Sequence, residues 1–134
     1  MKKYIALLSF LLFALTKVAA QKVFVINIRQ EIDPQMSHFV DLGLKAATRD
    51  SADYIIIDMD TYGGALTDAD KIRTALLDYP KPVYVYINKN AASAGALISI
   101  ACDSIYMDRG SNIGSATVVD GEGKPAPDKY QSFM

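Results

Sequence analysis

Ser93 lies in the segment Asn88 to Ala96, in which most of the other residues are alanine, glycine or asparagine. An apolar run typical of a strand precedes this segment, and an apolar run typical of a helix follows it. The Ser93 hydroxyl is therefore expected at a helix N-terminus, where unpaired backbone N–H groups and the helix dipole favour negative charge. Because small neighbours let a substrate backbone approach closely, the segment indicates a nucleophile, provided that a base and an oxyanion hole lie nearby. Tight helix packing is the alternative explanation of the same small residues.

A pair of glycines, Gly63 and Gly64, follows another apolar run that is typical of a buried strand. Sites in α/β sheets lie just beyond the carboxyl ends of the strands, so this pair is expected close to Ser93. Backbone N–H groups of Gly63 or Gly64, together with that of Ala94, are predicted to hold an oxyanion. A tight turn from strand to helix accounts for the glycine pair as well, and both interpretations hold at once.

The sequence does not identify the base. Its one histidine, His38, lies in the first predicted helix, far in sequence from Ser93, so a Ser-His-Asp triad has little support. A lysine acts as a base when desolvation lowers its pKa. The lysines available towards the C-terminus are Lys89, Lys124 and Lys129, and none of them is convincing, so the base stays unassigned.

Four aspartates between residues 58 and 70 raise the question of a metal site. Asp58 and Asp60, with Asp68 and Asp70, fail the calcium-loop pattern, because the twelfth position from Asp58 is Ala69 instead of glutamate. Zinc would need a cluster of histidine and cysteine ligands, which the chain lacks. We interpret the aspartates as solvated loop carboxylates and predict no metal or other cofactor. A formal net charge of −1 without a basic patch gives nucleic-acid binding little support.

Alternating strand and helix patterns predict the scaffold for these residues. The order argues for an α/β fold with a parallel core and right-handed crossovers. The first strand, rich in β-branched residues, is expected to be covered on both faces. Asp33 before Pro34 predicts an N-cap, Thr67 with Asp70 resembles a capping box, and Cys102 is expected to be a small core residue. The expected strands are 23–28, 54–57, 83–87 and 104–107, the expected helices are 34–50, 67–78, 92–101 and one starting at 129–134, and loops are expected at 58–64 and 109–128.

Residues 1–20 read as a secretory signal peptide. Lys2 and Lys3 form a positive start, an apolar run of about eleven residues follows, and small residues precede Gln21. The run is short for a membrane span of about twenty residues, although an uncleaved N-terminal anchor is the alternative. Residues 21–134 would then form one domain, which we expect to be truncated at its C-terminus.

Four motifs, in this order and spacing, resemble the ClpP-class serine protease domain of NfeD membrane proteins. The resemblance extends over most of Val23 to Val119. It departs from the family at Tyr62, where relatives often have proline. The motifs are Ile56 to Gly64 (IIDMDTYGG), Pro82 to Ile87 (PVYVYI), Ala91 to Ala96 (AASAGA) and Ser111 to Ala116 (SNIGSA).

This resemblance implies a ClpP/crotonase-like fold of repeated βαβ units and a serine–lysine dyad. Ser93 falls on the nucleophile, and Gly63, Gly64 and Ala94 fall on the oxyanion-hole region. The family's lysine lies on the helix after the Gly114 region, around or beyond the end of this chain. We therefore expect the 134-residue chain to be inactive by itself.

The resemblance also implies a function. It is that of an exported, membrane-associated serine endopeptidase, dimeric or larger, which cleaves apolar segments of membrane proteins such as stomatin-like proteins. The alternative is a non-catalytic crotonase-fold module that binds a stomatin-like membrane partner. A more distant alternative is a crotonase-type enzyme that acts on acyl-thioesters through oxyanion-hole N–H groups without a serine nucleophile.

Overall fold

The computed structural model of the chain describes residues 20–117, 119–120 and 122–127. The expected signal peptide and the expected helix at 129–134 lie outside these residues. The elements are β1 (Val23–Ile28), α2 (Pro34–Arg49), β2 (Tyr54–Thr61), α3 (Leu66–Leu77), β3 (Val83–Ala92), α4 (Ala94–Ser99), β4 (Ser104–Met107) and β5 (Asn112–Gly114).

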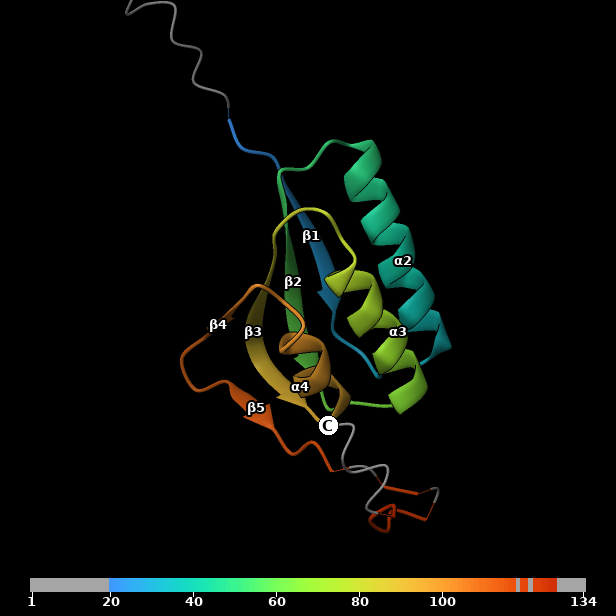
Figure 1. The fold of residues 1–134 in the computed structure, drawn as a ribbon. Coiled ribbons are helices and arrows are strands. Elements are labelled where there is room, and N and C mark those ends of the chain that lie inside the picture. Colours follow the sequence, from blue (N-terminus) through green and yellow to red (C-terminus); the bar gives the residue numbers. More distant parts are fainter. Residues whose placement is uncertain (1–19, 118, 121, 128–134) are drawn as a thin grey trace, which may run out of the picture.

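The strands form one parallel sheet in the order β1-β2-β3-β4, and β5 pairs with the last residues of β3. Each crossover moves the chain by one strand in the same direction. Because such crossovers are right-handed, they leave their helices on a single face of the sheet. Figure 1 shows α2, α3 and α4 together on that face. The expected α/β fold with a mainly parallel sheet is confirmed.

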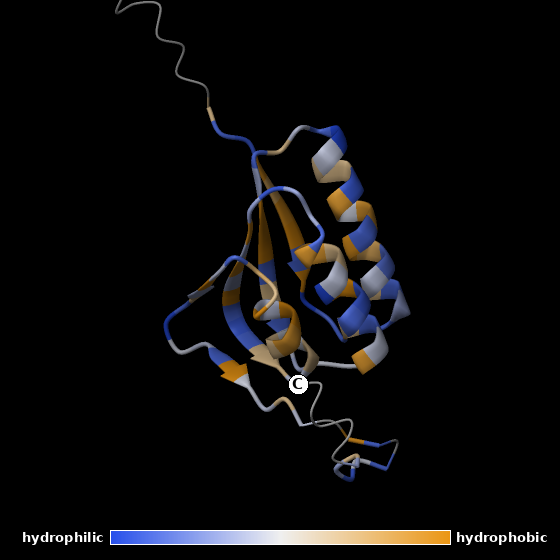
Figure 2. Cartoon of the chain, viewed as in Figure 1, coloured by the Kyte–Doolittle hydropathy of each residue, from blue (hydrophilic) through white to orange (hydrophobic). Residues whose placement is uncertain are grey.

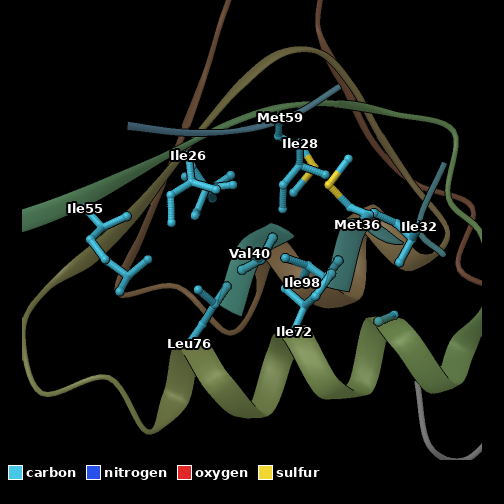
Figure 3. Close-up of a cluster of buried hydrophobic side chains, with 14 of the residues drawn as sticks. Ile26, Ile28, Ile32, Met36, Val40, Ile55, Met59, Ile72, Leu76 and Ile98 are labelled. Atoms are coloured by element: carbon cyan, nitrogen blue, oxygen red, sulfur yellow. The ribbon is translucent and has the colours of Figure 1, made fainter. Parts of the chain in front are cut away.

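The hydrophobic core lies between the sheet and the three helices. In Figure 2, hydrophobic and hydrophilic residues alternate around α2, as expected of a helix with one face on the sheet. Aliphatic side chains from both layers interdigitate in the close-up of Figure 3, and burial of such side chains is the main driving force for folding. They include Ile26 and Ile28 of β1, Ile55 and Met59 of β2, Val40 of α2, Ile72 and Leu76 of α3, and Ile98 of α4.

The opposite face of the sheet is open. Val25 of β1 is 51% exposed, so the expectation that β1 is covered on both faces is wrong. Tyr84 stands between Tyr54 and Tyr106, at ring-centroid distances of 5.7 and 6.2 Å. These rings line a cavity of about 730 Å³. The buried side chains of β1 lie on one face alone, because no helix in the described part of the chain crosses the other face.

Two strands extend further than the apolar pattern indicates. β2 runs to Thr61 and β3 runs to Ala92, so that Thr61 pairs with Ala91. β5 pairs with β3 within the stretch expected to be a loop. α4 is shorter than expected and begins at Ala94, directly after Ser93. The polar ends of β2 and β3 are held by pairing with their neighbours, which a hydrophobic pattern does not report.

The two predicted helix caps have different outcomes. Asp33 caps α2 as predicted, with its carboxylate accepting from the Met36 N–H at 2.7 Å. The predicted capping box of Thr67 and Asp70 is wrong, because α3 begins one residue earlier and has Ala65 at its N-cap. That cap makes no side-chain hydrogen bond.

Asp68 is buried between α2 and α3, although the sequence suggested a solvated carboxylate. Its Oδ1 accepts hydrogen bonds from Lys71 Nζ at 2.9 Å and from Ser37 Oγ at 3.0 Å. The hydrogen bond from Lys71 is the largest cause that lowers the pKa of Asp68. The charged carboxylate therefore ties the two helices together.

Replacing Asp68 by asparagine tests this contact through its pH dependence. A lowered pKa in the folded state adds stability above the unfolded pKa, near 4, and this stability disappears as the pH falls through the folded pKa. We expect Asp68→Asn to lower the urea midpoint at neutral pH, and the difference from the wild type to shrink in acid. Asp70→Asn is the control, because Asp70 pairs with Arg73 at the surface, where ion pairs contribute little. An equal effect of both variants would contradict the assignment.

Cys102 packs against the core after α4, in agreement with the sequence. Its thiol lies 3.7 Å from the Ile98 carbonyl oxygen, and burial raises its pKa to about 12.

Because the thiolate is the reactive form, we expect iodoacetamide to alkylate native Cys102 very slowly. Compared with a free thiol of pKa near 8.5, the rate at about pH 8 should fall roughly a thousandfold. The same protein in denaturant is the control and should react at the normal rate. Fast alkylation of the native protein would show that the thiol is open to solvent.

Candidate active site

Ser93 occupies a sharp turn between β3 and α4. Its backbone has φ 51° and ψ −114°, a conformation that glycine adopts freely and other residues rarely do. Holding a residue with a β-carbon in such a region costs about 1–3 kcal/mol and requires support from the surroundings. A serine on a strained turn from strand to helix is also the arrangement that exposes the nucleophile of α/β-hydrolases.

The backbone of Ser93 is anchored by hydrogen bonds on both sides. The Ser93 N–H donates to the Gly114 carbonyl oxygen at 2.8 Å, and the Ser93 carbonyl oxygen accepts from the Ala96 N–H at 3.0 Å. The side chain does not cap α4, and within the described part of the chain its hydroxyl has no hydrogen-bond partner. The β5 strand thus fixes the serine, a role that the polar sequence around it did not reveal.

The turn of Gly63 and Gly64 packs directly against this serine. A β-carbon on Gly63, which has φ 110°, would lie 2.8 Å from Ser93 Cβ and 3.3 Å from Ala94 N. On Gly64, with φ 153°, it would lie 2.1 Å from the Ile32 carbonyl oxygen. The structure therefore brings together the two segments that the sequence analysis singled out, and it leaves no room for a side chain at Gly63 between them.

The N–H groups of this turn are not equivalent. Gly63 N–H donates to Thr61 Oγ1 at 3.1 Å. The N–H groups of Gly64 and Ala94 have no acceptor among the residues that the structure describes. Ala94 is the first residue of α4, so its N–H has no partner within the helix. Two donors without an acceptor among these residues thus belong to the two segments that meet at Ser93.

Thr61, which the sequence analysis left in a loop, is part of this arrangement. It ends β2, is only 2% exposed, and donates its hydroxyl to the Gln30 carbonyl oxygen at 2.6 Å. A β-carbon on Gly95 would lie 2.7 Å from its methyl carbon. The signal that could have identified Thr61 is its place two residues before Gly63, within reach of that N–H.

The aspartates near the turn are paired with protein groups. Asp58 forms an ion pair with Arg29, and Asp60 accepts a hydrogen bond from Asn90 at 3.2 Å. Each of these two aspartates thus has one partner among the described residues, and the buried Asp58 Oδ1 has no hydrogen-bond partner there.

None of the candidate bases that the structure describes bonds to Ser93. His38 and Lys89 are exposed, on α2 and β3 respectively. Lys124 pairs with Glu122 at 2.7 Å, and Lys129 lies outside the described residues. The described part of the chain thus presents the serine and the N–H donors without a base.

Next to the turn lies a cavity of about 430 Å³. It is lined by Arg29, Glu31 and Asp60 together with Tyr62 and the glycine pair. Tyr62, which lines this cavity, is 82% exposed.

Two curated proteins are similar to this chain. Membrane protein NfeD1b of Bacillus subtilis (strain 168) is 38% identical over 117 residues, which are 87% of this chain and 27% of that protein. Membrane-bound protease PH1510 of Pyrococcus horikoshii is 28% identical over 125 residues, 90% of this chain and 28% of that protein. This chain thus spans little more than a quarter of each relative. Within its described residues, no helix has the length and apolar character to cross a membrane.

Solved structures extend the likeness. One is the 1510-N membrane-bound stomatin-specific protease, solved as a lysine-to-alanine mutant in complex with a substrate peptide. Its TM-score to this chain is 0.78 and its sequence identity is 27%, and the match covers 87% of this chain and 57% of that chain. A ClpP1 mutant from Listeria monocytogenes has a TM-score of 0.57 and 26% identity over 59% of this chain and 46% of that chain. An enoyl-CoA hydratase from Mycobacterium marinum shares the fold, with a TM-score of 0.58 and 21% identity. The match covers 67% of this chain and 49% of that chain.

These likenesses establish a ClpP/crotonase-like fold. A family model described as the N-terminal domain of NfeD1b matches residues 22–134. Because this match covers nearly the whole sequence, the chain belongs to the NfeD1b N-terminal domain family.

Proposed function

We propose that this chain carries the nucleophile and the oxyanion hole of a serine endopeptidase. The observation that carries the proposal is the strained turn at Ser93, which packs against Gly63 while its hydroxyl makes no hydrogen bond to any described residue. A serine anchored through its backbone, next to two N–H donors without an acceptor in the described part of the chain, matches the requirements of acyl transfer.

In the proposed reaction, Ser93 Oγ attacks the carbonyl carbon of a peptide bond and gives its proton to a neutral lysine amine. The carbonyl π electrons move onto oxygen, and the N–H groups of Gly64 and Ala94 stabilise the resulting charge. The tetrahedral intermediate collapses, the C–N bond breaks, and the leaving amine takes the proton from the lysine. Water then hydrolyses the acyl ester and restores Ser93.

Gly63 has a different part in this proposal from the one expected from the sequence. Because its N–H already donates to Thr61, we assign it to the close approach between the two turns. The donors that remain are the N–H groups of Gly64 and Ala94.

We assign the base to a lysine outside the described residues. His38 and Lys89 are exposed and Lys124 pairs with Glu122, and none of the three makes a hydrogen bond to Ser93. The 1510-N stomatin-specific protease has been solved both as a serine-to-alanine mutant and as a lysine-to-alanine mutant with a substrate peptide, which supports a serine–lysine pair.

The proposed substrates are peptide segments of membrane-associated proteins, including a stomatin-like protein. The support is the stomatin specificity of the 1510-N protease and its complex with a substrate peptide. We further propose that the full-length protein is exported, associated with a membrane and at least dimeric.

A second candidate function is a non-catalytic module that binds a stomatin-like membrane partner. It is favoured by the lack of a base next to Ser93 among the described residues. Chemical labelling of the serine separates the two candidates, because a pure binding module has no need of an activated hydroxyl.

A fluorophosphonate probe tests Ser93 directly in the full-length protein. We expect the wild type to be labelled and Ser93→Ala to show no labelling, because the probe reacts with activated serines. Ser51→Ala is the matched control, since Ser51 has a similar positive φ of 56° in the turn between α2 and β2. Its labelling should equal that of the wild type. A wild type that is folded and remains unlabelled would favour the binding module.

Replacing Gly63 by alanine tests the contact between the two turns. The added methyl group would lie 2.8 Å from Ser93 Cβ, so the turn must move away from the serine. Because displacements of about 1 Å cost roughly 100-fold in rate, we expect labelling of folded Gly63→Ala to slow by about that factor.

Gly110→Ala is the control for the backbone effect alone. Gly110 also has positive φ, 79°, but an added β-carbon there meets no atom within 4 Å. This variant should lose some thermal stability and keep the wild-type labelling rate. Equal labelling rates of Gly63→Ala and Gly110→Ala would show that the contact between Gly63 and Ser93 does not matter for the reaction.

A further inference from the structure

Building on the proposed function, we propose that Thr61 is a positioning residue for the oxyanion hole. Its hydroxyl oxygen accepts a hydrogen bond from the Gly63 N–H and thereby fixes the turn. The N–H of Gly64 then remains available to stabilise the oxyanion. Thr61 itself is buried and does not touch the substrate in this proposal.

The hydrogen bonds of Thr61 define this function. A hydroxyl has one hydrogen to donate, and the Gln30 carbonyl oxygen, at 2.6 Å, is much closer than the Gly63 carbonyl oxygen, at 3.4 Å. The hydroxyl oxygen of Thr61, Oγ1, in turn accepts a hydrogen bond from the Gly63 N–H at 3.1 Å. One buried side chain thus links the segment after β1 to the first glycine of the turn.

Backbone bonds hold the turn to the same segment after β1. The Ile32 N–H donates to the Gly63 carbonyl oxygen at 2.8 Å, and the Ala65 N–H donates to the Ile32 carbonyl oxygen at 2.7 Å. These two hydrogen bonds anchor the peptide unit before Gly64 and the peptide unit after it. The Gly64 N–H itself has no acceptor among the described residues. The Thr61 hydroxyl completes the arrangement by engaging the Gly63 N–H.

The methyl group of Thr61 makes the second contact. It lies under Gly95, where a β-carbon would come within 2.7 Å of it. Gly95 belongs to the first turn of α4, directly after Ala94, which provides the other proposed donor. Thr61 therefore contacts both segments that supply the oxyanion hole, through its hydroxyl on one side and its methyl group on the other.

Two variants separate the hydroxyl from the methyl group. Thr61→Val keeps the shape and removes the hydroxyl, whereas Thr61→Ser keeps the hydroxyl and removes the methyl group. If Thr61 acted only through packing, the serine variant would be the more damaged. Our proposal predicts the reverse order for catalysis.

The measurement is the kinetics of fluorophosphonate labelling of the full-length protein, with melting temperatures to establish that each variant is folded. We expect Thr61→Val to lower the rate constant of the chemical step about 10- to 100-fold and to leave probe affinity nearly unchanged. Thr61→Ser should stay within about threefold of the wild type. Wild-type labelling of Thr61→Val, or a slower Thr61→Ser, would overturn the proposal.

Hydrogen–deuterium exchange of the same full-length proteins provides a readout independent of activity. Without its acceptor, the Gly63 amide should exchange at least about tenfold faster in Thr61→Val, and at the wild-type rate in Thr61→Ser. Unchanged exchange in Thr61→Val would overturn the positioning function. If no variant and no wild type is labelled, the peptidase proposal fails, and the exchange experiment still decides whether Thr61 holds the turn.

Discussion

The arrangement of the candidate site depends on the close contact of two backbones at the carboxyl edge of the sheet. β2 and β3 are neighbours, so the turns that follow them meet, and Gly63 lies against Ser93. A side chain at Gly63 would separate the turn from the serine, and one at Gly95 would collide with Thr61. The glycines are required here by the lack of space, in addition to the positive φ at Gly63. This tight contact holds the turn that bears the Gly64 N–H against the turn that bears Ser93 and Ala94.

Much of the scaffold follows from local sequence patterns. The apolar runs identify β1 to β4, and the Asp33 cap marks the start of α2, because burial and capping act within a few residues. The ends of β2 and β3 were missed because Asp58 to Thr61 and Asn88 to Ala92 include polar residues that pairing with neighbouring strands keeps in the sheet. The exposed second face of the sheet was not predicted for a similar reason. An apolar strand shows that one face is covered, and only the crossovers determine whether the other is covered too.

The candidate site was predictable in its position and not in its details. Ser93, Gly63, Gly64 and Ala94 were identified from small residues placed after apolar runs, and the structure brings them together. The state of each N–H depends on Thr61, whose hydroxyl reaches a residue 31 positions away. Asp68 is similar, because Ser37 of another helix helps to bury and hold its charge. Contacts of this kind come from the tertiary arrangement, so no local pattern reports them.

The backbone angle of Ser93 also bears on how such a sequence changes over evolutionary time. At φ 51° a glycine would relieve the strain, so mutation to glycine at this position offers a gain in stability in every generation. Under the proposed function, selection for a reactive hydroxyl has to oppose that gain continuously. A lineage that no longer needs the chemistry is therefore expected to lose the serine early while it keeps the fold around it. The residue at this one position then records whether the surrounding scaffold is still selected as an enzyme.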